Sequence, residues 1–278
     1  MDLFRARDGR WVTDQQIRTA LEDVGAPDAK VVYMHTELSF GAPNQRFSRK
    51  QLLAALYETL SGIKVPTLCV PTFTFSFCNG EAYDVQRSAS KMGALNEYIR
   101  QLPNALRSSD PLMSVALVGE ERDLASDLGH HSIGSGSTFD KLHSRRGVKF
   151  LFFGASLSKC FTYTHYVEER EKVYYRYNRD FTGTIMDHGR PYRDTYSLFV
   201  RYRNVMPSTE GRLEKELTRS GALKLARCGD AAISCIDEPT AYATIVGQLR
   251  ADVNCYLVKP YPGDCLDREF AAHDMVAL

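Results

Sequence analysis

Residues 150–153 read Phe-Leu-Phe-Phe, a run of four apolar side chains in the middle of the chain. A strand that is apolar on both faces must be covered on both faces, so this run predicts a buried strand of a central sheet. Similar short apolar runs occur at residues 31–34, 67–70 and 115–118. Together the four runs predict the core strands of an α/β fold.

Signals for helices lie between these strands. Thr13 and Ser48 are each followed three residues later by Gln, which is the pattern of a capping box. After Ser48, apolar residues recur at the spacing of one helix face as far as Ile63, and Gly62 marks the end of the pattern. We therefore expect a helix to begin at each of these two caps and to pack one face on the core.

The character of the sequence changes after residue 180. Residues 195–202 predict a polar and aromatic strand, residues 212–223 a charged helix, and residues 237–252 a further helix. No internal repeat and no linker rich in Pro, Gly or Ser divides the chain. We expect an α/β fold with a mixed central sheet, flanking helices and a smaller C-terminal subdomain, residues 181–278, packed against residues 1–180.

The composition is that of a globular protein. Of 278 residues, 44% are hydrophobic and 25% are charged, which excludes a disordered or fibrous chain. Lys and Arg number 35 and Asp and Glu number 34, so the formal net charge is +1. This balance lacks the basic excess of a general nucleic-acid binder, and we expect no nucleic-acid partner.

The cysteines and the apolar runs predict a cytoplasmic protein. The seven cysteines are odd in number and form no C-x-x-C pair, so neither a disulfide framework nor a zinc knuckle is indicated. The charged start lacks the apolar stretch of a signal peptide, and the apolar run at residues 148–157 is too short to span a bilayer. We expect reduced thiols and no membrane partner.

His165 and Glu168 are the first candidates for chemistry. At a spacing of three they lie on one face of a helix, where the carboxylate can orient an imidazole base. The alternative is a surface His/Glu pair without a catalytic role, because so short a spacing often arises by chance.

Two other interpretations of this region are weaker. Cys160 lies five residues before His165 and could serve as a nucleophile, but free cysteines are commonly buried small apolar residues. A metal site would need three or four converging ligands. The candidates are His130, His131, His143 and Glu168, and no metal-binding spacing links them. We therefore expect no metal.

Two stretches could contact phosphate groups. Residues 132–137, Ser-Ile-Gly-Ser-Gly-Ser, lack the Lys-Ser/Thr of a Walker loop and the pattern of a dinucleotide fold, so an ordinary turn is the better interpretation. Arg87, Lys91 and Arg107 surround a Ser-rich stretch and could pair with phosphates, although surface cations without a ligand are the alternative. The residues alone thus predict an α/β enzyme with a His/Glu base.

A longer series of motifs resembles one known family. The blocks are residues 71–75 (Pro-Thr-Phe-Thr-Phe), residues 90–95 (Ser-Lys-Met-Gly-Ala-Leu), residues 107–116, which begin Arg-Ser-Ser-Asp-Pro, and residues 162–168, with the pattern Thr-x-x-His-x-x-Glu. In order and spacing they resemble the aminoglycoside 3-N-acetyltransferase family. Residues 35–41 resemble the opening segment of that family.

The resemblance, which is strong over residues 30–180, implies an acetyl-CoA-dependent N-acetyltransferase of a fold unrelated to the GNAT acetyltransferases, with no metal. By position, His165 would be the base that takes a proton from the acceptor amine, and Glu168 its partner. Direct transfer would then need no enzyme nucleophile. Thr72 would help to hold the thioester carbonyl or the acceptor, or would only bond to the backbone at a strand end.

The same resemblance implies an acetyl-CoA site. The matching segments contain His35, Thr36, Ser39, Lys91, Met92, Gly93, Arg107, Ser108 and Ser114. Their hydroxyls and amides suit pantetheine and a tetrahedral oxyanion, and their cations suit phosphates. Residues 1–180 would form the acetyl-CoA-binding catalytic portion, and residues 181–278 would complete the acceptor site.

Two departures from the family pattern concern the acceptor. Residues 161–165 read Phe-Thr-Tyr-Thr-His where the family has Asn-Thr-x-Leu-His, and residues 107–111 read Arg-Ser-Ser-Asp-Pro where it has Arg-Ser-x-His-Pro. The expected partner is therefore a small-molecule amine whose identity the family does not fix. Three alternative functions stay open: aminoglycoside acetylation with antibiotic resistance, a hydrolase that uses Cys160, and a scaffold without activity. A homodimer is also possible.

Charge favours an anionic acceptor such as a nucleotide-linked amino sugar. An enzyme for a polycation gains from an acidic surface, and this chain has no excess of carboxylates. Four cations that suit phosphate or carboxylate groups follow Glu168. They are Arg170, Lys172, Arg176 and Arg179. Carboxylates interleave with them, so a solvated helix face or part of the donor site is the alternative.

Overall fold

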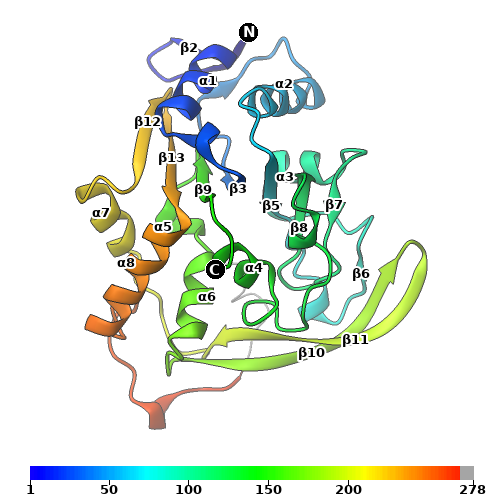
Figure 1. Ribbon diagram of the computed structural model, residues 1–278, viewed down its shortest axis with the longest axis vertical. Coiled ribbons are helices and arrows are strands. Elements are labelled where there is room, and N and C mark those ends of the chain that lie inside the picture. Colours follow the sequence, from blue (N-terminus) through cyan, green and yellow to red (C-terminus); the bar gives the residue numbers. More distant parts are fainter. Residues whose placement is uncertain (270–278) are drawn as a thin grey trace.

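The sheet predicted from the apolar runs forms the centre of the molecule. In the computed structural model, which describes residues 1–269, seven strands lie in the order β12-β13-β9-β3-β5-β8-β7 (Figure 1). Their bounds are β3 (Val31–Thr36), β5 (Thr67–Pro71), β7 (Leu106–Arg107), β8 (Val115–Gly119), β9 (Val148–Phe153), β12 (Lys224–Cys228) and β13 (Ala231–Asp237). The four apolar runs are the adjacent strands β9, β3, β5 and β8, which confirms the prediction.

The sheet is mixed, as predicted. β3 runs parallel to β9 and β5, whereas β13 and β8 run antiparallel to their neighbours. The carboxyl ends of β3, β5 and β9 therefore share one edge with the first residues of β8 and β13. In α/β proteins this edge is where ligands bind.

Helices cover both faces of the sheet. Val32 and Met34 of β3 join a core that also contains residues of α1, α2 and α3, whereas Val31 and Tyr33 join a second core with residues of α4 to α8. The bounds are α1 (Asp14–Asp23), α2 (Arg49–Ser61), α3 (Ala94–Arg100), α4 (Thr138–His143), α5 (Leu157–Cys160), α6 (Tyr163–Arg170), α7 (Arg212–Arg219) and α8 (Glu238–Ala251). The sheet is thus the middle layer of three.

The two predicted caps are present. The side chain of Thr13 accepts from the amide of Gln16, and the side chain of Ser48 accepts from the amide of Gln51, each completing a capping box. α2 ends at Ser61, directly before the predicted Gly62. Local sequence therefore decides where both helices begin.

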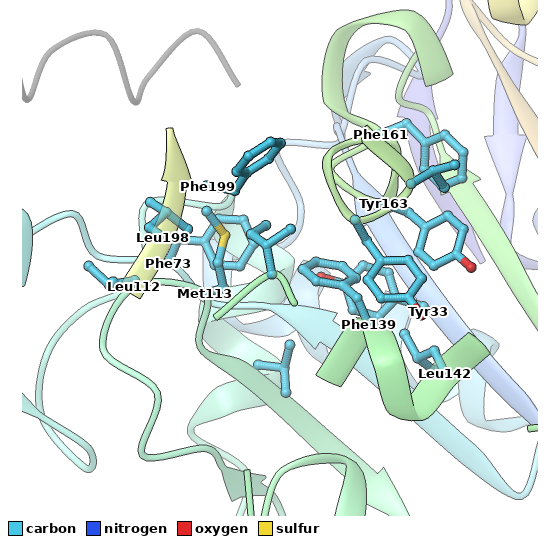
Figure 2. Close-up of a cluster of buried hydrophobic side chains, with 14 of the residues drawn as sticks. Tyr33, Phe73, Leu112, Met113, Phe139, Leu142, Phe161, Tyr163, Leu198 and Phe199 are labelled. Carbon is cyan, nitrogen blue, oxygen red and sulfur yellow. The ribbon is translucent and has the colours of Figure 1, made fainter. Parts of the chain in front are cut away.

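The second core is rich in aromatic rings where it meets α6 (Figure 2). The ring centroid of Phe150 on β9 lies 4.6 Å from that of Tyr163 and 4.8 Å from that of Phe161. Tyr33 on β3 lies 5.8 Å from Phe139 of α4. Close aromatic packing of this kind orients the elements that carry it. It holds α6, the helix of His165 and Glu168, against the sheet.

A long hairpin extends from this assembly (Figure 1). β10 (Arg176–Asp187) and β11 (Arg190–Arg201) pair along their whole length, and β10 also pairs with β6 (Tyr83–Asp84). The sequence predicted only residues 195–202 of it. A small sheet of β1 (Asp2–Arg5), β2 (Trp11–Thr13) and β4 (Ala42–Pro43), and 3-10 helices at Ala26–Asp28, Phe77–Asn79, Arg122–Leu124 and Gly263–Cys265, complete the described elements.

The C-terminal portion is joined closely to the rest. β13 pairs with β9, and β12 pairs with β13, so these strands extend the main sheet. The predicted helix at residues 212–223 ends earlier, at Arg219, and α8 matches its predicted range. No helix within residues 1–269 is long and apolar enough to cross a membrane.

Candidate active site

His165 and Glu168 are neighbours on α6. The Nδ1 atom of His165 lies 2.7 Å from Oε2 of Glu168, which is the contact expected at this helical spacing. Glu168 is buried and His165 is largely buried, with 4% and 14% of their side-chain surfaces exposed. α6 therefore brings an imidazole and a carboxylate together away from bulk water.

Two residues that follow α6 complete this cluster. Tyr175 donates its phenolic hydrogen to Oε1 of Glu168 at 2.7 Å. Arg176, the first residue of β10, places Nε 2.8 Å from Oε2 of the same carboxylate, and its side chain is only 3% exposed. The sequence predicted that Arg176 is a cation that binds the acceptor, whereas in the structure its guanidinium pairs with Glu168.

The cluster keeps Glu168 ionised and His165 neutral near pH 7. Burial alone would raise the pKa of Glu168, but the charge of Arg176 and the hydrogen bonds from His165 and Tyr175 outweigh burial and lower this pKa to about 2. Burial, followed by the charge of Arg176, lowers the pKa of His165 to about 4, although Glu168 acts in the opposite direction. The imidazole is therefore in the form that can accept a proton.

The Nδ1 atom of His165 lies 2.7 Å from two groups of opposite character, Oε2 of Glu168 and Nη2 of Arg176. A protonated Nδ1 can donate only to the carboxylate, and an unprotonated Nδ1 can accept only from the guanidinium. The first state leaves the lone pair on Nε2, which is the state that base catalysis requires.

A cavity of about 430 Å³ lies beside His165. Its walls come from α5, α6, the start of β10, the end of β11, the start of α7 and residues 255–257. The lining residues are Leu157, Ser158, Lys159, Cys160, Phe161, Thr164, His165, Glu168, Tyr175, Arg176, Arg201, Pro207, Ser208, Thr209, Gly211, Arg212, Leu213, Cys255, Tyr256 and Leu257. Such a volume suits a small molecule.

Cations outnumber carboxylates around this cavity. Among the described residues that line it, Glu168 is the one carboxylate, and it is already paired with Arg176. The four lining cations are Lys159, Arg176, Arg201 and Arg212. Of the cations that the sequence placed after Glu168, only Arg176 lies here. The lining formed by residues 1–269 therefore has no unpaired carboxylate to attract a polycation.

Cys160 lines the same cavity but is not activated. Its Sγ atom donates to the carbonyl oxygen of Ser156 at 3.1 Å, and burial raises the pKa of the thiol to about 12. A nucleophilic cysteine needs a lowered pKa, because the thiolate is the reactive form. The geometry thus gives no support to a cysteine-dependent hydrolase.

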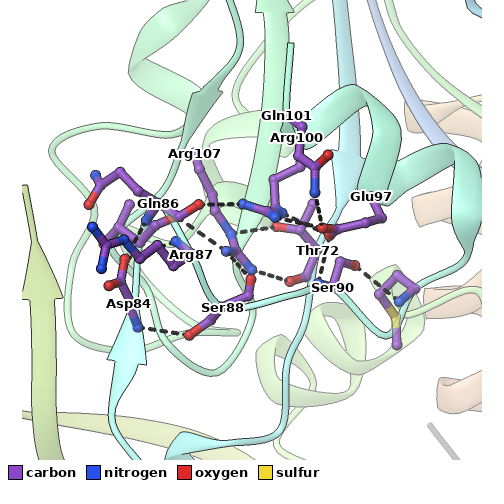
Figure 3. Close-up of polar contacts among 12 residues, drawn as sticks. Thr72, Asp84, Gln86, Arg87, Ser88, Ser90, Glu97, Arg100, Gln101 and Arg107 are labelled. Atoms are coloured by element: carbon purple, nitrogen blue, oxygen red, sulfur yellow. Dashed lines mark hydrogen bonds and ion pairs between the residues drawn. The ribbon is translucent and has the colours of Figure 1, made fainter. Parts of the chain in front are cut away.

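Thr72, Arg107 and Ser114 form a buried network at the carboxyl edge of the sheet, part of which is shown in Figure 3. Arg107 donates to the carbonyl oxygens of Thr72 at 2.8 Å and Ser88 at 2.6 Å, and the Ser114 hydroxyl donates to the Thr72 carbonyl at 2.8 Å. The guanidinium thus points at protein oxygens, which does not fit the predicted phosphate contact. The Thr72 hydroxyl donates to Oγ of Ser114 at 3.2 Å and accepts from Nε of Arg107 at 3.3 Å, so it is also bonded within this network.

The adjoining loop is held by groups of the same kind. The Ser108 hydroxyl accepts from the amide of Val115 at 3.0 Å. Asp110, which stands where the family carries His, accepts from the amides of Leu112 and Met113 at 2.9 and 3.0 Å, and burial raises its pKa. These residues stabilise the loop between β7 and β8.

His35 ends the buried part of β3 at the same edge. Its ring stacks on Phe152 with centroids 5.5 Å apart, and burial lowers its pKa to about 3, so it is neutral near pH 7. The Nε2 atom of His35 is buried and has no hydrogen-bond partner among residues 1–269.

The next residues of this edge are hydrogen-bonded to neighbouring loops. The hydroxyl of Thr36 donates to Oδ1 of Asn96 at 2.8 Å, and that of Ser39 donates to the carbonyl of Gly154 at 2.8 Å. Gly93 has φ +98°, and a Cβ there would lie 3.2 Å from the Thr36 hydroxyl. Gly93 is therefore required for the close approach of α3 to β3.

Lys91 and Met92 lie in the loop before α3, exposed and half-buried respectively. The amide of Lys91 donates to the carbonyl of Phe73 at 2.9 Å, and that of Met92 donates to the Ser90 hydroxyl at 3.0 Å. Both residues therefore lie near the carboxyl edge, and Lys91 is an exposed cation there.

The three histidines considered for a metal are separated by their hydrogen bonds. His130 pairs with Asp194, and Nδ1 of His131 accepts from the amide of Gly134. His143 pairs with Glu238 at 2.8 Å. Within residues 1–269 no group of three or more His, Cys, Asp or Glu side chains could hold a metal ion.

Sequence reasoning missed Tyr175 and the cavity walls after residue 200. Tyr175 lies seven residues after Glu168, but α6 ends at Arg170, so the two residues do not belong to one helix. The chain turns between them at Lys172, a residue other than glycine with φ +53°. No sequence signal marks this contact, because it depends on a turn in the left-handed region that lysine rarely adopts.

The family of this chain follows from a comparison with protein-family models. Residues 44–250 match the model described as aminoglycoside 3-N-acetyltransferase. The chain belongs to this family. It is an acetyl-CoA-dependent N-acetyltransferase, as the motifs predicted, and its acceptor is a small-molecule amine.

Solved structures share the fold of this acetyltransferase. The apoenzyme of aminoglycoside acetyltransferase AAC(3)-IVa is 23% identical, with a TM-score of 0.72 and coverage of 90% of this chain and 92% of that chain. AAC-IIIb in a binary complex with CoASH is 19% identical, with a TM-score of 0.70 and coverage of 90% and 99%. YokD from Bacillus subtilis is 18% identical, with a TM-score of 0.71 and coverage of 87% and 95%. No curated protein sequence matches the chain.

Proposed function

We propose that this enzyme transfers the acetyl group of acetyl-CoA directly to a primary amine of an anionic amino sugar, with His165 as the base and Glu168 as its partner. The observation that carries this proposal is the largely buried 2.7 Å contact between Nδ1 of His165 and Oε2 of Glu168, which lies beside the cavity. A carboxylate at Nδ1 favours the tautomer that has its lone pair on Nε2. An amine bound in the cavity would meet that lone pair.

The reaction then needs no covalent enzyme intermediate. The amine nitrogen attacks the carbonyl carbon of the thioester, and its proton passes to Nε2 of His165 as the C–N bond forms. The attacking nitrogen becomes more acidic as this bond forms, so a base whose pKa is near 4 can take the proton. The tetrahedral intermediate then loses the CoA thiolate, which receives the proton from His165.

Acetyl-CoA would lie along the carboxyl edge of the sheet. The residues of this edge that would contact the donor are His35, Thr36, Ser39, Lys91, Met92 and Gly93. Two observations support this placement: Lys91 is exposed, and the buried Nε2 of His35 has no protein partner within residues 1–269. Thr72, Arg107, Ser108 and Ser114 would instead position the edge through their buried network.

The acceptor would occupy the cavity. Its walls come from residues 157–176 and from residues 201–257, which fits the expectation that the C-terminal portion completes the acceptor site. The excess of cations in its lining favours an anionic amino sugar, such as a nucleotide-linked one, over a polycationic aminoglycoside.

Steady-state kinetics would test this choice of acceptor. A nucleotide-linked amino sugar and a 2-deoxystreptamine aminoglycoside would be compared at several salt concentrations, with a chelator present. We expect a higher kcat/KM for the nucleotide-linked amine, and this preference should weaken as salt screens the cations. A higher kcat/KM for the aminoglycoside would show that the acceptor class is wrong.

A further inference from the structure

Two of the cations that line the cavity do not pair with another residue of its lining. Arg176 is paired with Glu168, and Arg201 also has an interaction within the protein. Lys159 is exposed, and within residues 1–269 its ammonium group has no hydrogen bond or ion pair. Arg212 has a 3.7 Å ion pair with Asp252 in which both side chains are more than half exposed. Such an exposed pair is weak, so Arg212 can change partner readily.

The fold brings together the residues that directly precede these two cations. Gly211, directly before Arg212, has φ +64°, and a Cβ on it would lie 3.2 Å from the Cβ of Ser158, directly before Lys159. Glu214 of α7 accepts from the amide of Ser158 at 3.0 Å, which ties α7 to α5. The start of α7 and the residues of α5 therefore meet at the positions next to the two cations.

We propose that Lys159 and Arg212 bind the phosphate or diphosphate group of the acceptor. This inference deepens the proposed function and rests on it. Both cations share the cavity with His165, so an acceptor whose phosphates they hold would have its amine in the same cavity as the imidazole. Apolar and aromatic side chains of the cavity would contact the apolar face of the sugar ring. They are Leu157, Phe161, Leu213, Tyr256 and Leu257.

Coenzyme A also carries a diphosphate, so the test must separate the two sources. Lys159→Gln and Arg212→Gln would be made singly and together, with Arg219→Gln as the matched control. Arg219 lies on the same helix, is 76% exposed and pairs with Glu216, but does not line the cavity. KM would be measured separately for acetyl-CoA and for the nucleotide-linked amino sugar.

We expect the double variant to raise KM for the nucleotide-linked amine by about tenfold to a hundredfold, because two charge-assisted contacts are lost. The values of kcat and of KM for acetyl-CoA should stay within about twofold, as lost ground-state binding requires. Calorimetry with uridine diphosphate or inorganic diphosphate should show binding to the wild type and to Arg219→Gln, and weaker binding to the double variant.

The possible failures are distinguishable. If the double variant raises KM for acetyl-CoA instead, the cations serve the donor and the inference is overturned. If acetyl transfer depends on His165 but the double variant binds diphosphate and acceptor as the wild type does, the phosphate site is wrong and the proposed function stands. If no amine shows transfer that depends on His165, both are overturned.

Discussion

His165 is the residue on which the proposed transfer depends most directly. His165→Ala should lower kcat by about 10²- to 10⁴-fold, because a positioned base contributes roughly that factor. The affinity for acetyl-CoA should change little, since the imidazole is not expected to hold the donor. Glu168→Gln should lower kcat less. Single-turnover kinetics and calorimetry would measure the two effects separately, and full activity of His165→Ala at neutral pH would exclude it as the base.

The low pKa of His165 gives the pH profile a particular form. Because burial and Arg176 keep this pKa near 4, His165 is neutral above that pH, and kcat should not fall as pH is lowered from 8 to 6 on its account. Arg176→Gln removes a cation that disfavours the imidazolium, so the acid limb of kcat should move to higher pH. Arg193→Gln, on the exposed outer part of β11, is the matched control. An acid limb that moves downward in Arg176→Gln would contradict this assignment.

Cys160 should prove dispensable for chemistry although it lines the same cavity. With a pKa near 12, its thiol is protonated at neutral pH, and direct transfer does not use it. Cys160→Ser should keep kcat within about twofold, measured with the best acceptor. A soluble, folded Cys160→Ser variant without activity would restore the covalent route.

At the scale of single residues, the sequence predicted the His165 and Glu168 contact because a helix fixes the geometry of a spacing of three. It could not predict that Arg176 faces Glu168, or that Arg107 faces the carbonyls of Thr72 and Ser88. The sequence shows that a residue is an arginine but not which group its guanidinium contacts. Its role depends on the turn at Lys172 and on strand pairing, which are tertiary properties.

At the scale of elements, α6 is held by contacts on the side away from the cavity. The hydroxyl of Tyr163 donates to Glu238 of α8, and His143 of α4 lies 2.8 Å from the same carboxylate. Glu238 is only 2% exposed, so a lost partner leaves a poorly solvated charge. These contacts join α4 and α8 to α6, the helix that carries the base.

Tyr163→Phe should therefore destabilise the protein by about 1–3 kcal/mol, the usual effect of leaving a buried polar group without its partner. Tyr174→Phe is the matched control, because Tyr174 donates to Asn254 at an exposed position. Urea unfolding would measure both changes. Equal stability of Tyr163→Phe and the wild type would show that His143 alone satisfies Glu238.

The elements differ in how clearly the sequence marks them. The four apolar runs predicted the central strands because both faces of those strands are buried, and the capping boxes predicted two helix starts. Most of the β10–β11 hairpin escaped prediction, because most of β10 is only partly buried, the first half of β11 is mainly exposed, and neither has an apolar pattern. A strand is recognised in a sequence by its apolar residues, and a strand needs such residues only where the fold buries it.

At the scale of the whole molecule, the chain after residue 180 is part of the main sheet and of the second core. β13 covers the edge of β9 over residues 149–153, and β11 pairs with β10 throughout. The second core contains residues from both portions, among them Phe150 and Ile236. One wall of the cavity also comes from the later portion.

Residues 1–180 expressed alone should therefore fail to fold cooperatively. The shortened chain would expose the hydrogen-bonding edge of β9 and would keep only the first five residues of β10, without their partner strand. Unpaired strand edges of this kind promote aggregation. It would also open the core that supports α6, so α6 could not hold His165 beside Glu168. We expect loss of near-ultraviolet circular dichroism and no sharp thermal transition, whereas the full chain should unfold in one transition. A cooperative transition in the fragment, together with acetyl-CoA binding, would show instead that residues 1–180 are an independent domain.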